Sequence, residues 1–292
     1  MSQAAADSVT LFVEHVTHID CGVLDPSRGL RGATWLVDAE LTGTRDDQGM
    51  LFDFGPAKKL LKSEIDALVD HRLLVPRQAP GITRTDDGVA LTTHEGDHYD
   101  YRGPAEALTD LDMAEITPER LADWLGQRVA RQLPANVDSL SLTLRAEIID
   151  GPVYDYTHGL SAHDGNCQRL AHGHRCRLAV WLDDQERADI AQAFAARWQG
   201  IFIGSREHLT TPADATRLGF AYDAPQGHFA IELDAAHCAL IDGPATVENI
   251  ADAIARRLAV EHTGHRVTVK AYEGVGKGAV VSHGRRASAL PA

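Results

Sequence analysis

The sequence predicts an α+β protein made of two tandem copies of one unit, each a four-stranded antiparallel sheet with two helices on one face. The main observation is a repeated pattern, T-x-E-x-(L/I)-A-D, which begins at Thr117 and again at Thr246. In both places it opens an amphipathic helix with the threonine as the expected N-cap. Each helix is followed by alternating polar and apolar residues that lead to a glutamate, at 139–149 and at 266–273. Two matched segments in the same order indicate a tandem duplication.

The boundary between the copies is expected near Gly151 and Pro152, because this pair of residues favours a turn between regular elements. The predicted domains are therefore 1–152 and 153–292.

The remaining elements complete the same order in each copy. The first copy has an early strand at 34–42 and a helix at 58–69, and the second has a strand at 175–182 and a helix at 184–198. Each copy then contains two strands, two helices and two strands, the order of an antiparallel sheet covered on one face. Residues 78–110 interrupt the first copy and are predicted to be a surface insertion or a hairpin, without chemistry.

Composition excludes several classes of function. The 292 residues carry 28 basic and 42 acidic side chains, a formal net charge of −14, which gives no general attraction for nucleic acid or an anionic membrane. No stretch approaches the ~18 apolar residues of a membrane span. The first residues, 1–7, lack the features of a signal peptide. We therefore expect a soluble, cytoplasmic protein with no nucleic-acid or membrane partner.

The clearest chemical pattern is a cluster of histidines in the second copy. On a strand, His172 and His174 point to the same side, and His163 from a neighbouring strand could complete a set of three imidazoles. Three neutral imidazoles leave a tetrahedral zinc ion one open position, which is typical of a catalytic site. Cys167 lies between these histidines in the sequence.

Other interpretations of the cluster stay open on the residues alone. A His-x-His pair can simply be the polar face of a strand, and imidazole also suits copper, iron and nickel. Cys176 shares the side of His174 and could be a fourth ligand or a small buried residue.

At these residues the sequence resembles the family of 6-pyruvoyltetrahydropterin and 6-carboxytetrahydropterin synthases, whose fold is the tunnelling fold (T-fold). Family members have an upstream histidine, a cysteine and His-Gly-His for zinc, and later a Thr-x-Glu helix start and a glutamate that holds the pterin. The second copy keeps these features at His163, Cys167, His172, His174, Thr246 and Glu273.

The first copy resembles a different part of the family pattern. It has the Gly-Met-x-x-Asp-Phe segment at 49–54 and the Asp-His pair at Asp70 and His71. Where His-Gly-His should stand it has Arg31, Gly32 and Ala33, which cannot hold zinc. The first copy is therefore expected to be free of metal.

The resemblance implies one composite site per chain, formed within one chain or between chains. Zinc on the three histidines would polarise the substrate's hydroxyls, and Cys167 would be the base. Asp70 would orient His71, which would exchange protons with the cysteine or the substrate. Glu273, or less strongly Glu147, would accept hydrogen bonds from the pterin. Without the family, Asp70 and His71 could simply end a helix, and Glu273 could belong to a turn.

The implied reaction is a lyase reaction on 7,8-dihydroneopterin triphosphate that releases triphosphate. Four residues separate Cys167 from His172, whereas three typify the carboxy enzymes and five the pyruvoyl enzymes. We expect the 6-carboxy product, as in queuosine-type deazapurine synthesis. The 6-pyruvoyl product, an aldolase-like or cyclohydrolase-like reaction, and non-catalytic pterin or metal binding are the alternatives. A T-fold joins its sheets into a barrel on association, so a homo-oligomer is expected.

Overall fold

The computed structural model describes residues 8–284, so the terminal residues 1–7, which were interpreted as lacking a signal peptide, lie outside the described part. The chain forms two compact units that do not follow the two sequence copies. Among the described residues, unit 1 contains those up to Ile19, then Trp35–Asp70 and Ile116–Glu147, and unit 2 contains Asp20–Thr34, His71–Glu115 and those from Ile148 onward. None of the helices in 8–284 has the length and apolar character needed to cross a membrane.

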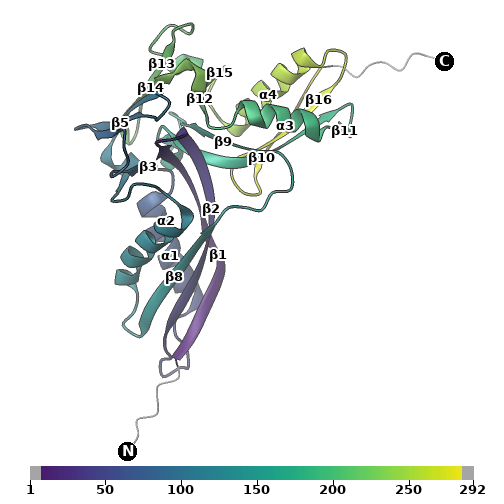
Figure 1. The fold of residues 1–292 in the computed structure, drawn as a ribbon. Helices are drawn as coiled ribbons and strands as arrows, with labels where there is room; N and C mark the ends of the chain where they lie inside the picture. Colours follow the sequence, from purple (N-terminus) through teal and green to yellow (C-terminus); the bar gives the residue numbers. More distant parts are fainter. Residues whose placement is uncertain (1–7, 285–292) are drawn as a thin grey trace, which may run out of the picture. The chain divides into compact units, whose positions relative to one another are not determined.

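Unit 1 is built on a sheet with two helices on one of its faces (Figure 1). The sheet contains most of β1 (Ser8–Asp25) and β2 (Gly29–Thr44), together with β8 (Val137–Arg145), which pairs antiparallel with β2. The helices are α1 (Phe54–Val69) and α2 (Pro118–Val129), whose apolar faces are buried. Burial of these faces supplies most of the stability of such a layer.

Helix starts follow the predicted caps. The Oγ1 of Thr117 accepts a hydrogen bond from the N–H of Arg120, and that of Thr246 accepts one from the N–H of Asn249. The second cap opens α4 (Val247–Glu261). Both caps satisfy backbone donors that the first helical turn leaves without a partner, so the predicted helix starts are confirmed.

Helix α1 begins earlier than the predicted residue 58. The Asp53 carboxylate accepts a hydrogen bond from the N–H of Gly55 and caps the helix at that point. The aspartate of the Gly-Met-x-x-Asp-Phe segment at 49–54 is therefore a helix cap in the structure.

Unit 2 contains the four-stranded antiparallel sheet that the sequence predicts for the second copy, with two helices packed on it. Its order is β9, β10, β16 and β17, and parallel strands β12 and β15 extend it beyond β9. The elements of this layer are β9 (Val153–His158), β10 (His172–Leu182), β11 (Gln185–Glu186), α3 (Ala188–Arg197), β12 (Ile201–Ser205), β15 (Cys238–Ile241), α4, β16 (Val267–Tyr272) and β17 (Gly278–His283).

Helix α3 is shorter than the predicted helix at 184–198. Asp183 and Asp184 both have positive φ angles, of 47° and 74°, and form the tight turn between β10 and β11. Aspartate tolerates this left-handed conformation better than most residues do. The predicted helix began at 184 because the spacing of apolar residues does not separate this turn from the helix that follows it.

The segment at 78–110 contains the hairpin that was one of its two interpretations, since β5 pairs antiparallel with β6. This hairpin and β4 belong to a sheet with the order β13-β14-β6-β5-β4, which combines strands from both sequence copies. The corresponding strands between the two helices of the second copy, β13 and β14, were not predicted, although Phe229, Ile231 and Leu233 of β14 alternate with less buried residues. The strands of this sheet are β4 (Ile82–Arg84), β5 (Gly88–Thr92), β6 (His98–Arg102), β13 (Arg217–Ala224) and β14 (Gly227–Asp234), whereas β3 (Leu73–Pro76) pairs in parallel with the end of β1 and with β7 (Leu108–Leu111).

The first copy also differs in its last strand. β8 ends at Arg145, before Glu147, and the chain then continues into β9. Within the described residues the first copy therefore has three long strands where the second copy has four, because it has no counterpart of β17.

Candidate metal and acid–base site

Three histidines of unit 2 bring their ring nitrogens together at one end of β9 and β10. His158 ends β9, and His172 and His174 begin β10, where His172 lies directly opposite His158 in the antiparallel register. One ring nitrogen from each of the three lies within 4.8 Å of those of the other two. All three side chains are at most 1% exposed.

Two of these rings donate their other N–H to backbone carbonyls. The Nδ1 of His158 lies 2.7 Å from the carbonyl oxygen of Ala245, and the Nδ1 of His172 lies 2.7 Å from that of Arg169. A carbonyl can only accept, so the proton of each ring is on Nδ1 and the lone pair is on Nε2.

The ring of His174 lies beside a carboxylate instead of a carbonyl group. Its Nδ1 lies 3.2 Å from Oδ1 of Asp20, and both side chains are 1% exposed. The same carboxylate oxygen accepts a hydrogen bond of 2.6 Å from the hydroxyl of Thr34. Asp20 is a functional candidate that the sequence analysis missed, since its signal was only one acidic residue inside an otherwise apolar strand segment.

Of the three Nε2 atoms, those of His158 and His172 therefore carry lone pairs. Those of His158 and His174 are 3.2 Å apart, and that of His172 has no hydrogen-bond partner although it is buried. Lone pairs at this distance repel unless a proton or a cation lies between them. Imidazoles whose outer nitrogen donates to a carbonyl or carboxylate are the usual ligands of zinc, so this arrangement fits a metal ion.

Burial keeps two of these rings neutral. Removal from water and the neighbouring His174 lower the pKa of His158 to about 3, and burial with the adjacent histidines lowers the pKa of His172 well below its ordinary value. Because neutral imidazole is the form that binds metal, no proton has to leave the site at neutral pH.

The structure does not bring His163 into this group, as the sequence analysis had expected. His163 is exposed, and its Nδ1 accepts a hydrogen bond of 2.9 Å from the N–H of Gly165 in the loop between β9 and β10. His158 takes the expected place, because it is the residue that the antiparallel register sets against His172. The pattern that could have identified His158 is its position at the end of the alternating segment 153–158.

A second group adjoins the first and shares His172. Ligand atoms of His71, Cys167 and His172 lie within 4.8 Å of one another, and the rings of His71 and His172 are 4.9 Å apart at their centroids. Two of the residues predicted to carry acid–base chemistry, one from each sequence copy, thus meet within unit 2 of a single chain.

The backbone at His71 has a left-handed conformation. Its φ is 53°, and its N–H donates a hydrogen bond of 2.7 Å to the carbonyl oxygen of Asp20. At the corresponding turn after α3 the second copy has Gly200, with φ 70°. A glycine adopts this conformation without strain, whereas a histidine does so at some cost in free energy. The backbone conformation of this turn therefore gives no reason for a histidine at position 71.

The second copy has no Asp-His pair at this turn. Gln199 and Gly200 occupy the place of Asp70 and His71, since the N–H of Gly200 donates to the carbonyl oxygen of Asp155 as that of His71 does to Asp20.

Asp70 and Glu147 belong to unit 1. Asp70 ends α1, where its N–H donates to the carbonyl oxygen of Asp66 at 3.3 Å, and Glu147 follows the end of β8. The orienting role of Asp70 and the substrate-binding role of Glu147 stay predictions.

Glu273 lies at the end of β16 beside a lysine. Its carboxylate is 3.4 Å from Nζ of Lys277 and is 20% exposed. Burial by itself would lower the pKa of Lys277, but the charges of Glu273, Asp20 and Cys167 outweigh it and raise that pKa. Lys277 therefore remains a cation in the same electrostatic environment as the two carboxylates and the candidate base.

Cys176 is a buried core residue, in agreement with the second of its two interpretations. It is fully buried, its Sγ accepts a hydrogen bond of 3.2 Å from the N–H of Gly274, and burial raises the pKa of its thiol. It belongs to neither group of potential ligands in the described chain.

An ion pair between the two copies includes Arg31, which stands in the first copy where the second has the first histidine of His-Gly-His. Asp155 on β9 is 2% exposed, and its Oδ2 accepts hydrogen bonds from Nε of Arg31 at 2.7 Å and from the N–H of Gly32 at 3.1 Å. The second guanidinium nitrogen and the side-chain amide of Gln199 donate to its Oδ1. The guanidinium of Arg31 thus neutralises the carboxylate of Asp155. In the metal group, the carboxylate of Asp20 lies beside the imidazole of His174 instead.

We predict that replacing Arg31 by methionine destabilises the protein by about 3 kcal/mol, because Asp155 would be a buried charge without its cation. Urea denaturation monitored by fluorescence measures the loss. The double variant Arg31→Met/Asp155→Asn should recover at least half of it, since no buried charge remains. A single variant within about 1 kcal/mol of the wild type would contradict the prediction.

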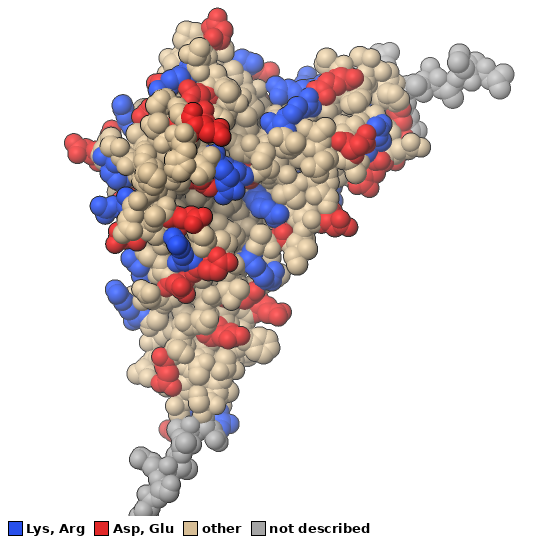
Figure 2. Space-filling model, in the orientation of Figure 1, with Lys and Arg blue, Asp and Glu red and all other residues tan. Residues whose placement is uncertain are grey.

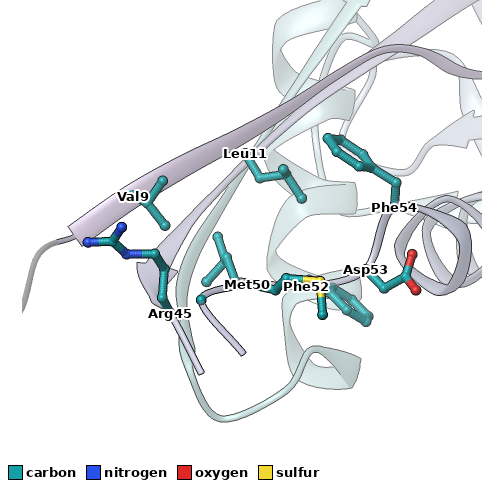
Figure 3. A pocket seen from close by; sticks show the side chains of 9 residues that line it. Val9, Leu11, Arg45, Met50, Phe52, Asp53 and Phe54 are labelled. Atoms are coloured by element: carbon teal, nitrogen blue, oxygen red, sulfur yellow. The ribbon is translucent and has the colours of Figure 1, made fainter. Parts of the chain in front are cut away.

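A separate hollow in unit 1 carries no comparable chemistry. It has a volume of about 320 Å³ and is lined by side chains that include Leu11, Met50 and Phe54 (Figure 3). The one carboxylate on its lining, that of Asp53, caps α1. An apolar hollow without converging polar groups lacks what orients a reacting substrate.

Comparison with known proteins shows the family of the chain. A family model described as 6-pyruvoyl tetrahydropterin synthase matches the chain twice, over residues 12–149 and 147–283. The chain belongs to this family. The two consecutive matches confirm the predicted tandem arrangement of two T-fold repeats in this pterin synthase family member.

Individual relatives match one part of the chain. A Pyrococcus horikoshii protein provisionally described as a 6-carboxy-5,6,7,8-tetrahydropterin synthase is 26% identical over 115 residues, which are 39% of this chain and 67% of that protein. A Pyrococcus abyssi protein with the same description is 27% identical over 110 residues, 38% of this chain and 64% of that protein. The chain thus spans about two thirds of the length of these relatives.

Solved structures of 6-pyruvoyl tetrahydropterin synthases also match about half of the chain. The enzyme of Plasmodium vivax has a TM-score of 0.41 at 16% identity and covers 47% of this chain and 91% of its own. That of Plasmodium falciparum has a TM-score of 0.40 at 15% identity and covers 47% and 90%.

Proposed function

We propose that the protein is a zinc-dependent lyase that acts on 7,8-dihydroneopterin triphosphate and water and forms 6-carboxy-5,6,7,8-tetrahydropterin, with release of triphosphate and of the other two side-chain carbons as acetaldehyde. The observation that carries the proposal is the convergence of three buried imidazoles beside a thiol and a fourth imidazole. A metal-binding group and an acid–base group that share His172 can act on adjacent atoms of one substrate.

The proposed ligands are His158, His172 and His174, with Asp20 as the carboxylate that orients the third ring. Zinc bound there would supply a Lewis acid for the hydroxyl groups of the substrate side chain. The Nδ1 protons of His158 and His172 are held by backbone carbonyls, which keeps the Nε2 lone pairs of these two rings directed into the group before any ligand arrives.

Cys167 and His71 would move the proton. The thiolate of Cys167 would take a proton from the side-chain carbon or hydroxyl, and the imidazole of His71 would receive it and return it to the product. The left-handed backbone and the hydrogen bond from its N–H to Asp20 hold His71 at this place. Asp70, the preceding residue, would fix the orientation of the ring.

Glu273 would recognise the pterin by accepting hydrogen bonds from its amino and ring N–H groups. Acidic and basic side chains are interspersed on the face of the molecule in Figure 2, and the net charge is −14. Attraction of a triphosphate would therefore depend on individual cations near the site, of which Lys277 beside Glu273 is the first candidate.

The 6-carboxy product is proposed because the two Pyrococcus relatives are described as forming it. The protein would belong to a queuosine-type pathway in the cytoplasm. A homo-oligomer is proposed because β8 and β17 are outer strands of their sheets, and pairing between copies would close sheets into a barrel.

We expect the zinc-loaded protein to release triphosphate from 7,8-dihydroneopterin triphosphate, with a metal content near one zinc per chain. Ion chromatography measures the triphosphate and mass spectrometry identifies the pterin. A 6-pyruvoyl product would replace the proposed reaction by the alternative one. No release from protein with its metal fully bound would favour non-catalytic pterin binding, and two zinc ions per chain would contradict the single composite site.

A further inference from the structure

The tip of the β13–β14 hairpin is attached to the segment that carries Cys167. This segment is the short 3-10 turn Asn166–Gln168, which lies in the loop between β9 and β10. It is not part of a sheet ladder, so its position depends on the contacts that it makes. Gln226, in the turn between β13 and β14, makes two of these contacts and a third to the next residue, Arg169, and the N–H of Leu160 donates to the carbonyl oxygen of Cys167 at 3.0 Å.

Gln226 uses three separate groups on three residues around Cys167. Its backbone N–H donates to Oε1 of Gln168 at 2.7 Å, and its side-chain amide donates to Oδ1 of Asn166 at 3.0 Å. Its Oε1 accepts from Nε of Arg169 at 2.8 Å. The residues bound are those on either side of Cys167 and the next one along the chain.

The acceptor and donor groups behind this contact are themselves fixed. Gln168 is fully buried, its side-chain amide donates to the carbonyl of Gly165 at 2.9 Å, and its own carbonyl accepts from the hydroxyl of Tyr222 at 2.8 Å. A buried polar set with every member paired is rigid, and removal of one member loosens its neighbours.

The contact with Arg169 extends to the metal group. Arg169 is 7% exposed, and its carbonyl oxygen accepts the hydrogen bond from Nδ1 of His172. The same amide of Gln226 is therefore linked on one side to the turn with Cys167 and on the other to a proposed ligand.

We infer that Gln226 is a positioning residue that holds the thiol of Cys167 in place against His71 and His172. This inference rests on the proposed role of Cys167 in proton transfer. Gln226 does not touch the reacting groups, and it acts through the turn. A catalytic group that is displaced by about 1 Å can lose about 100-fold in rate, so loss of these contacts should affect the chemical step more than substrate binding.

The test compares Gln226→Ala with a control from the same hairpin, His228→Ala. His228 is 61% exposed, and its hydrogen bond is to Asp223 within the hairpin, at 2.9 Å. For Gln226→Ala we expect kcat to fall at least about tenfold, with KM within about twofold and the zinc content unchanged. Amide exchange of the peptide at 160–170 should become faster. His228→Ala should leave kcat and this exchange at the wild-type values.

A conservative variant separates positioning from general damage. In Gln226→Glu the carboxylate still accepts from Arg169, and the amide of Asn166 can turn to donate to the other oxygen. We expect this variant to recover most of kcat and of the slow amide exchange. Failure of Gln226→Glu to recover either quantity would overturn the inference.

Other outcomes are equally decisive. Unchanged exchange or unchanged kcat in Gln226→Ala would overturn the positioning role, even with an active enzyme. If Cys167→Ala keeps full turnover, the proposed function of the thiol fails instead, and the exchange measurement alone reports the contact.

Discussion

His158→Ala is expected to lower the affinity for zinc by more than about 100-fold and to abolish turnover. It removes one of three converging Nε2 atoms, and even partners of metal ligands are worth about 10–100-fold in affinity. Competition with a chromophoric chelator measures the affinity, and circular dichroism confirms that the variant is folded.

His163→Ala is the matched control, because it removes a histidine from the same segment that the structure places outside the group. It should bind zinc as tightly as the wild type. If His163→Ala loses the metal while His158→Ala keeps it, the ligand set given by the structure is wrong and the original interpretation of the sequence is right.

His71→Gly is expected to reduce kcat by about 100- to 10,000-fold, the usual range for loss of a proton-transferring side chain. The free energy of unfolding should stay within about 1 kcal/mol of the wild type, because glycine adopts the φ of 53° more readily than histidine. Steady-state kinetics and urea denaturation provide the two values, and zinc content should not change.

His71→Asn gives the second arm of this experiment. Asparagine also tolerates a left-handed backbone but cannot exchange a proton, so it should be as inactive as glycine while it keeps the turn. Activity of either variant within about threefold of the wild type would remove His71 from the acid–base pair.

Part of the site could be predicted from residues that lie close together in the sequence. The alternation that places His172 and His174 on one side of a strand is a property of three consecutive residues, and the structure has both in the group. The Thr117 and Thr246 caps are local in the same sense, since each joins residues within one helical turn. Spacing of this kind is set by the backbone and needs no knowledge of the fold.

Residues that meet across the fold could not be predicted in this way. His163 and His158 are both upstream of His-Gly-His, and only the pairing of β9 with β10 shows that His158 faces His172. Asp20 reaches His174 from another sequence copy, and Gln226 reaches the Cys167 turn from a hairpin whose strands the sequence did not reveal.

The duplication, the two capped helices and the two different residue patterns of the copies could be predicted from the sequence alone. One copy is rich in histidine and the other has an Asp-His pair. The tertiary structure decided which histidine completes the metal group, that His71 meets Cys167 within one chain, and that Arg31 neutralises Asp155 in the other copy. The reason is physical: periodicity and capping depend on neighbours along the backbone. Strand register and the pairing of buried polar groups depend on residues brought together only when the core forms.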